Sequence, residues 1–171
     1  EKLYAAGYDY SYNPSFVGVS VWDGISWQPL GTEPTGGVYA LQISADGTLY
    51  AGVVFEYGMF PSYGIAYWAD NSWHRVSELD ISSTISDFEF DAQGGIVVSG
   101  YYHNGYPDYD GSITRWDGYR WRHLGGGVWD DDSSERYYGE AYTVDIQNDT
   151  TIFVGGEFGR AGSIPSANIA S

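Results

Sequence analysis

The 171-residue sequence contains no cysteine, few cationic residues and no long apolar run. Without cysteine, disulfide bonds and thiolate chemistry are excluded, whereas the redox compartment stays open. No stretch approaches the roughly 18 consecutive apolar residues that a membrane-spanning helix needs, so we expect no membrane insertion. No extended segment has the 3.6-residue apolar period of an amphipathic helix. Long helices are therefore not expected.

The shortage of cations leaves a strongly acidic chain. It has 7 Lys and Arg residues against 23 Asp and Glu residues, and its net charge is −16. An acidic surface repels phosphate backbones and anionic lipids, so nucleic-acid binding is not expected. The charge is compatible with solubility outside the cell, with cation binding or with a salty habitat. A solvated acidic surface is the simplest interpretation.

Aromatic residues and glycine are abundant instead. The chain contains 17 Tyr, 7 Trp, 7 Phe and 24 Gly residues. Aromatic side chains favour strands and glycine favours tight turns. This composition predicts an all-β protein built from short strands.

Four types of strand recur in a fixed order along the chain. The first type begins at equivalent apolar residues: Leu3, Leu49, Ile96 and Ile152. The second type ends in tryptophan, and the third begins with tryptophan five residues later: Trp22 and Trp27, Trp68 and Trp73, Trp116 and Trp121. The fourth type has apolar residues at a period of two: Val38 to Ile43, Ile85 to Phe90 and Tyr142 to Ile146.

The spacing of the repeats predicts the architecture. The first strand type recurs after 46, 47 and 56 residues. Four strands in a period of roughly 40–50 residues are typical of one blade of a β-propeller. Turn signals agree with this register, because Asp23-Gly24, Asp70-Asn71 and Asp117-Gly118 lie between the tryptophan-bearing strands. We expect the tryptophans to pack between neighbouring blades, where large flat side chains bury most area.

These motifs resemble Kelch and galactose-oxidase-type β-propellers. They are closer still to the Trp-Asp-Gly-x-x-Trp repeats of large secreted bacterial surface proteins and of fungal cortical polarity-marker propellers. The matching segments are Trp22 to Trp27, Trp68 to Trp73, Trp116 to Trp121, Val154 to Phe158 and Ala161 to Ala170. The diglycine of the first strand of that family survives only at Gly155-Gly156. The resemblance implies a fold and carries over no catalytic residues.

We therefore expect an all-β fold, a β-propeller of four-stranded antiparallel blades, with about three and a half blades in residues 1–171. The approximate repeats are 3–48, 49–95, 96–151 and a partial repeat at 152–171. Counted as blades, with the fourth strand type innermost and the third type outermost, the strands form sets of three, four, four and three. Such a set does not close a ring, since propellers have about four to eight blades. Further blades would come from the same polypeptide or from a second copy of the chain.

Two classes of long loop are rich in tyrosine and acidic residues, and in a propeller both lie on one face. Tyrosine with Asp and Asn on loops is the chemistry of sugar recognition, and equally of a protein-binding surface. Packing within the loops is the alternative role for these tyrosines. The predicted contact surface comprises Tyr10, Tyr12, Tyr57, Tyr63, Tyr106, Tyr109 and Trp129.

A metal site is a weaker possibility. Asp130, Asp132 and Glu135 offer the hard oxygen ligands that Ca²⁺ prefers. Their run lacks the glycine-punctuated spacing of a calcium-binding loop, so a solvated acidic loop is favoured and no cofactor is expected. No catalytic set is evident. A glycosidase needs two carboxylates at a defined separation, and the sequence alone pairs none of the candidates Asp9, Glu56, Asp108 and Glu157.

The sequence thus predicts a non-catalytic binding or adhesion module, extracellular or at the cell surface, that presents its loop face to a glycan or protein. Two alternatives stay open. One is a structural subunit that assembles when strand edges complete the propeller. The other is a glycan-processing or metal-dependent enzyme domain.

Overall fold

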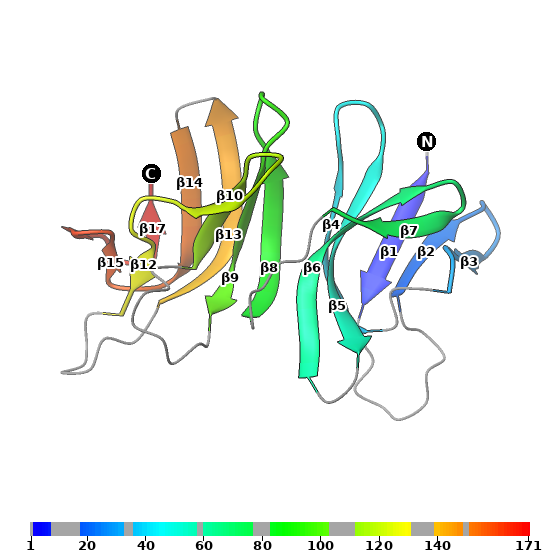
Figure 1. Ribbon diagram of the computed structural model, residues 1–171, viewed down its shortest axis with the longest axis horizontal. Helices are drawn as coiled ribbons and strands as arrows, with labels where there is room; N and C mark the ends of the chain where they lie inside the picture. The colour runs from blue at the N-terminus through cyan, green and yellow to red at the C-terminus, as the bar shows by residue number, and fades with distance from the viewer. Residues whose placement is uncertain are drawn as a thin grey trace. The chain divides into compact units, whose positions relative to one another are not determined.

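The computed structural model of the chain (Figure 1) describes residues 2–7, 18–32, 36–57, 60–76, 83–102, 112–130, 139–148 and 151–171. Among these residues there are strands and turns but no helix. Consequently, no described helix is long and apolar enough to cross a membrane. The chain divides into two compact units, residues 1–81 and residues 82–171.

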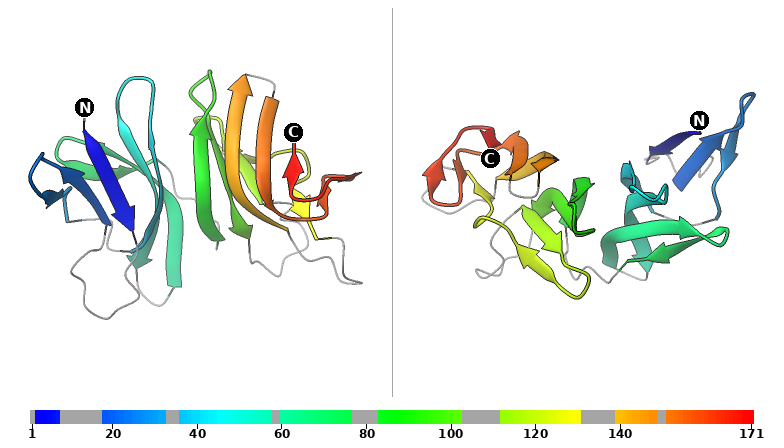
Figure 2. Two further views of the ribbon diagram at one scale, coloured as in Figure 1. Left: turned by 180° about the vertical axis from the view of Figure 1, so that it is seen from behind. Right: turned by 90° about the horizontal axis from the view of Figure 1, so that it is seen from above.

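Unit 1 contains two antiparallel sheets. The strands are β1 (Leu3–Gly7), β2 (Gly18–Trp22), β3 (Trp27–Pro29), β4 (Val38–Ile43), β5 (Leu49–Tyr57), β6 (Phe60–Ala69) and β7 (Ser72–Arg75). One sheet has the order β1-β2-β3 and the other the order β4-β5-β6-β7. Figure 2 shows both sheets from two further directions.

Unit 2 contains three sheets. Its strands are β8 (Ser83–Phe90), β9 (Ile96–Tyr102), β10 (Ile113–Trp116), β11 (Trp121–His123), β12 (Val128–Trp129), β13 (Glu140–Asn148), β14 (Thr151–Glu157), β15 (Arg160–Ala161), β16 (Ile164–Pro165) and β17 (Ile169–Ala170). The sheet orders are β11-β10-β9-β8, β13-β14-β17 and β12-β15-β16.

The all-β class predicted from composition and repeats is confirmed. Sheets of three, four, four and three strands occur with the predicted neighbours, and the fourth strand type lies at one edge of the sheet wherever it is present. The small sheet β12-β15-β16 was not predicted. Its strands are two residues long, and so short a segment shows no periodicity in the sequence.

Three of the sheets share one pairing register, with a bulge at the same place. Three strand pairs (β4 with β5, β8 with β9 and β13 with β14) each shift by one residue near the same end. The extra residues are Tyr39, Ser86 and Tyr142. A bulge turns a side chain away from the regular alternation, and Tyr39 and Tyr142 are indeed 40% and 48% exposed. The prediction that these two tyrosines belong to an apolar alternating face is therefore wrong.

Glycine next to the bulge allows two backbones to approach closely. Gly100 and Gly156 occupy equivalent positions, opposite Ile85 and Ala141. A Cβ atom on Gly100 would overlap the carbonyl oxygen of Thr84, and one on Gly156 would overlap that of Glu140. Gly7 stands at the equivalent position of β1, where a Cβ atom would meet nothing within 4 Å. The neighbouring strand therefore leaves no room for a side chain at Gly100 and Gly156, whereas β5 carries Val53 at the equivalent position.

The tryptophans form cross-strand pairs in three sheets. Trp22 pairs with Trp27, Trp68 with Trp73 and Trp116 with Trp121, and in every pair the ring centroids are 5.4 Å apart. The offset of five residues places both rings at the end of a hairpin. Aromatic pairs at this separation attract one another beyond the burial of area.

In unit 1 one of these pairs packs against the other sheet, as expected. Trp68 and Trp73 contact a core that includes Val19, Ala51 and Val53. The indole Nε1–H of Trp73 donates a hydrogen bond of 2.9 Å to the carbonyl oxygen of Leu30, the residue after β3. The pair therefore joins sheet β4-β5-β6-β7 to sheet β1-β2-β3.

In unit 2 the core lies between sheet β11-β10-β9-β8 and sheet β13-β14-β17, and includes Ile113, Val144 and Val154. A carboxylate also links these sheets. Asp87 accepts hydrogen bonds from the Thr143 hydroxyl at 2.9 Å and from the buried Val144 N–H at 3.1 Å. Because an unsatisfied buried N–H is costly, this bond fixes β13 against β8.

Candidate functional site

The predicted contact surface is described only in part. Tyr10, Tyr12, Tyr106 and Tyr109 lie outside the described residues, as do Asp9, Asp108, Asp132 and Glu135. The described strands do show where three of the loops attach. Residues 8–17, 58–59 and 103–111 all connect the first strand type to the second, and therefore leave from the equivalent end of each sheet.

The prediction of a long loop from Tyr57 to Tyr63 is wrong. Strand β5 continues to Tyr57 and β6 begins at Phe60, so that only Gly58 and Met59 separate the two strands. The physical reason is the run of β-branched and aromatic residues in β5, which favours a longer ladder. Tyr63 lies within β6, half-buried and opposite Val54. The structure places Tyr57 and Tyr63 on one hairpin.

Trp129 also lies in a strand rather than in a loop. It pairs with Arg160 in the small sheet, and its indole N–H donates a hydrogen bond of 2.7 Å to the Gly126 carbonyl. Its ring is half-buried. The indole therefore helps to hold the turn before β12, and part of its surface stays open to a partner.

Of the three acidic residues considered for Ca²⁺, the structure describes only Asp130, which is exposed. Within the described ranges, no group of three or more His, Asp or Glu residues is placed to hold a metal ion.

Two facing carboxylates that the sequence did not pair lie on β13 and β14. Glu140 and Glu157 are direct cross-strand neighbours. The hydroxyl of Tyr142, the bulge residue, donates a hydrogen bond of 3.1 Å to Glu157. Hydrogen bonding to Glu140 is the largest cause that raises the pKa of Tyr142 to about 12, with desolvation and Glu157 adding to it. The one signal available in the sequence is the shared position of Tyr39 and Tyr142 in the fourth strand type.

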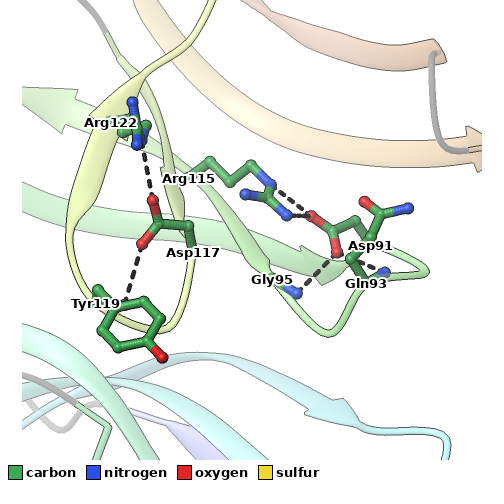
Figure 3. A network of polar contacts seen from close by, with 7 residues as sticks. All are labelled: Asp91, Gln93, Gly95, Arg115, Asp117, Tyr119 and Arg122. Atoms are coloured by element: carbon green, nitrogen blue, oxygen red, sulfur yellow. Dashed lines mark hydrogen bonds and ion pairs between the residues drawn. The ribbon is translucent and has the colours of Figure 1, made fainter.

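Two other carboxylates in unit 2, Asp91 and Asp117, hold turns in place (Figure 3). Asp91 accepts hydrogen bonds from the N–H groups of Gln93 and Gly95, at 2.9 and 2.7 Å, and from Arg115 Nε at 2.5 Å. Its side chain is 8% exposed, so the ion pair is largely shielded from water. The carboxylate thereby ties the β8–β9 turn to β10. This role is structural.

The Trp-Asp-Gly-x-x-Trp hairpins use their aspartate in a similar way. Asp117 accepts hydrogen bonds from the Tyr119 N–H at 3.0 Å and from Arg122 Nε at 2.9 Å (Figure 3). It also accepts one from the Arg120 N–H at 3.0 Å. Asp23 makes the same backbone contacts with Ile25 and Ser26. The β6–β7 hairpin differs, because Asp70 and Asn71 both have positive φ, at 50° and 58°, as a two-residue type I′ turn requires.

These contacts predict an acid-resistant carboxylate. The Arg120 N–H, the Arg122 side chain and the Tyr119 N–H, in that order of effect, lower the pKa of Asp117 to about 2. Since the folded pKa lies below the unfolded value, the stabilisation by Asp117 is complete above pH 3.8 and is lost as pH falls toward 2. Carboxyl-carbon NMR titration should give this pKa for Asp117.

Two variants separate the causes. Arg122→Leu removes a side-chain donor and should raise the pKa of Asp117. Arg120→Leu keeps the backbone N–H and should change it less. An ordinary carboxyl pKa in the unmodified chain would contradict the described turn.

One concavity in the described part of the chain is apolar. It has a volume of about 720 Å³ and lies in unit 2. Leu124, Gly125, Ile152 and Ala170 contribute to its wall, and none of the described residues that line it carries an ionisable side chain. Glu140, Tyr142 and Glu157 are not among them. The cavity therefore suits an apolar group and offers no acid or base for catalysis.

Comparisons of the chain with protein-family models, with curated proteins and with solved structures found no match.

Proposed function

We propose that the chain is part of a β-propeller that serves as a non-catalytic binding or adhesion module, extracellular or at the cell surface. One observation supports this proposal most. The first and second strand types pair in the same register in two sheets, Leu3 with Trp22 and Ile96 with Trp116, so the tyrosine-rich segments 8–17 and 103–111 connect equivalent strand ends. In a propeller such loops lie on one face.

A glycan or a protein surface is the partner that this chemistry fits. Tyrosine rings bury a large area on a sugar or protein at little entropic cost, and the neighbouring Asn and Asp side chains bond hydroxyls or amides. The net charge of −16 disfavours anionic partners. The apolar lining of the cavity argues against catalysis there.

The test compares tyrosines from the two ends of one strand. Tyr106→Ala combined with Tyr109→Ala should weaken binding to a glycan array, or to surface proteins in a binding assay, by at least about tenfold. Tyr119→Ala is the matched control, because Tyr119 is 92% exposed but lies in the β10–β11 turn at the opposite end of β10. Equal losses for both variants, or binding that neither changes, would overturn the proposed face.

A second function is favoured by the sheet edges. Strand β1 lies at an edge of its sheet with Leu3 60% exposed, and β17 lies at an edge of another. Exposed edges can pair with further strands. We therefore keep assembly by completion of these sheets as the second candidate.

A further inference from the structure

Unit 1 shows how a tryptophan hairpin is held by the sheet before it in the chain. Here "the hairpin" denotes residues 68–76, which carry Trp68 and Trp73. Trp73 donates its indole hydrogen bond to Leu30. A Cβ atom on Gly31 would lie only 2.8 Å from the ring atom Cζ3 of Trp68. The hairpin therefore packs against Leu30 and Gly31, its docking position. The ring of Trp68 fits there because Gly31 has no side chain.

Unit 2 contains an equivalent docking position, formed by Leu124 and Gly125. Leu124 N–H bonds to Ile113 O at 3.1 Å, as Leu30 N–H bonds to Val19 O at 2.8 Å, so Leu124 and Gly125 correspond to Leu30 and Gly31. Gly31 and Gly125 both have positive φ, at 85° and 60°. A Cβ atom on Gly125, however, would meet nothing within 4 Å. In unit 2 the described residues leave this place open.

The sheet that faces it also matches its counterpart in unit 1. Ile169 pairs with Gly155 and Ala170 with Val154, in the register that joins Ile65 to Gly52 and Ala66 to Ala51. The equivalent residues nevertheless differ in burial. Leu49 and Ala66 are 5% and 0% exposed, whereas Ile152 and Ala170 are only half-buried. All four side chains lie on the core face of their sheets, which in unit 1 also carries Trp68 and Trp73. At this position the core is therefore covered in unit 1 and open in unit 2.

The cavity of about 720 Å³ occupies this position, since Leu124, Gly125, Ile152 and Ala170 all line it. A cavity of about 150 Å³ accepts one benzene ring, so the space is ample for two indoles. Its apolar wall suits aromatic rings. The Leu124 carbonyl already accepts the Gly127 N–H at 2.9 Å, and its second lone pair supplies the acceptor that Leu30 supplies in unit 1.

We propose that this cavity is the docking site of a tryptophan hairpin that continues β17. Its first tryptophan follows β17 as Trp68 follows Tyr67. Its second strand pairs with the outer edge of β17, where it displaces the Ser166 hydroxyl from the Ile169 carbonyl, and the indole of its second tryptophan donates to the Leu124 carbonyl. This inference deepens the second candidate function, completion of the sheet at β17, and does not depend on the tyrosine-rich loops or their ligand.

The experiment appends a copy of residues 68–76 to Ser171 of the full chain. The indole N–H groups of the copied tryptophans should exchange with solvent at least about tenfold more slowly than in the free peptide. The urea midpoint of unfolding should rise. A matched extension with both copied tryptophans replaced by serine should show no gain.

A substitution at Gly125 tests whether the hairpin binds at this docking position. Gly125→Asn fits the unextended chain, because the space is open and Asn tolerates positive φ. In the extended chain its side chain should block the hairpin and abolish the protection. Indole exchange as fast as in the free peptide, in a folded chain, would overturn the proposal.

Two further outcomes are decisive. If the extended chain does not fold, the copied peptide is added to the unextended chain. NMR shifts at Ile152 and Ala170 then support the site, and their absence overturns it. A dimer of the unextended chain that both Trp27→Ser and Gly125→Asn dissociate would also overturn the proposal, since the occupant would then be a second copy.

Discussion

Replacement of Gly100 by alanine is expected to lower the free energy of unfolding by about 3 kcal/mol. The added Cβ atom would overlap the carbonyl oxygen of Thr84, which belongs to the neighbouring strand of the same sheet. This contact is with backbone, so no side chain can rotate away. Strands β8 and β9 would have to separate next to their bulge and lose ladder hydrogen bonds. Urea unfolding, followed by circular dichroism, measures the change.

Gly7→Ala is the matched control because Gly7 holds the same register position in β1. Nothing lies within 4 Å of the methyl group that alanine would add there, and the φ of Gly7 is not positive. The substitution then mainly reduces the entropy of the unfolded chain, so it should be neutral or stabilise by up to about 1 kcal/mol. Gly156→Ala should resemble Gly100→Ala. Equal effects of Gly7→Ala and Gly100→Ala would contradict the close strand approach.

Replacement of Trp73 by alanine should cost about 3 kcal/mol of stability. The variant loses the ring pair with Trp68, the contact with the core of unit 1 and the hydrogen bond to Leu30. Trp73→Phe keeps most of the apolar area, and should cost about 1 kcal/mol for the missing indole donor. Thermal or urea unfolding of the two variants separates packing from hydrogen bonding.

Trp27→Ala provides the comparison within the same unit. Trp27 also forms a pair with a ring centroid distance of 5.4 Å, but it is 38% exposed and its partner Trp22 is 36% exposed. Its removal should cost about 1 kcal/mol, the value of an aromatic pair alone. If Trp27→Ala proves as damaging as Trp73→Ala, the contact with Leu30 does not provide the additional stability.

The repeats predicted the sheets well because each strand type carries its own pattern. Tryptophans five residues apart mark the ends of paired strands, and this alone locates β2 with β3, β6 with β7 and β10 with β11. The bulges were not predicted. An extra residue such as Ser86 breaks the period of two only once, and the sequence cannot distinguish this break from ordinary variation.

Contacts between distant residues explain the rest of what could not be predicted. Asp91 and Arg115 are 24 residues apart, and Asp87 and Val144 are 57 apart. No local pattern relates such residues. The first pair meets because β10 lies beside β9 within one sheet, and the second because β13 packs against β8 of another sheet. The cavity was also not foreseen, because it is defined by Leu124 and Ile152 from different sheets. Two residues that were predicted to lie in loops, Tyr63 and Trp129, lie in strands, because strand pairing extends further than the sequence pattern predicted.

The hydrogen bond from Trp73 to Leu30 also affects how unit 1 unfolds. The two sheets of unit 1 share one apolar core. The stability of each sheet therefore depends on its contact with the other, as in repeat proteins, where each repeat contacts only its neighbours. Local unfolding of either sheet therefore exposes the apolar face of the other. We therefore expect the amides of β2 and of β6 to show a common opening free energy in native-state hydrogen exchange, as one cooperative block.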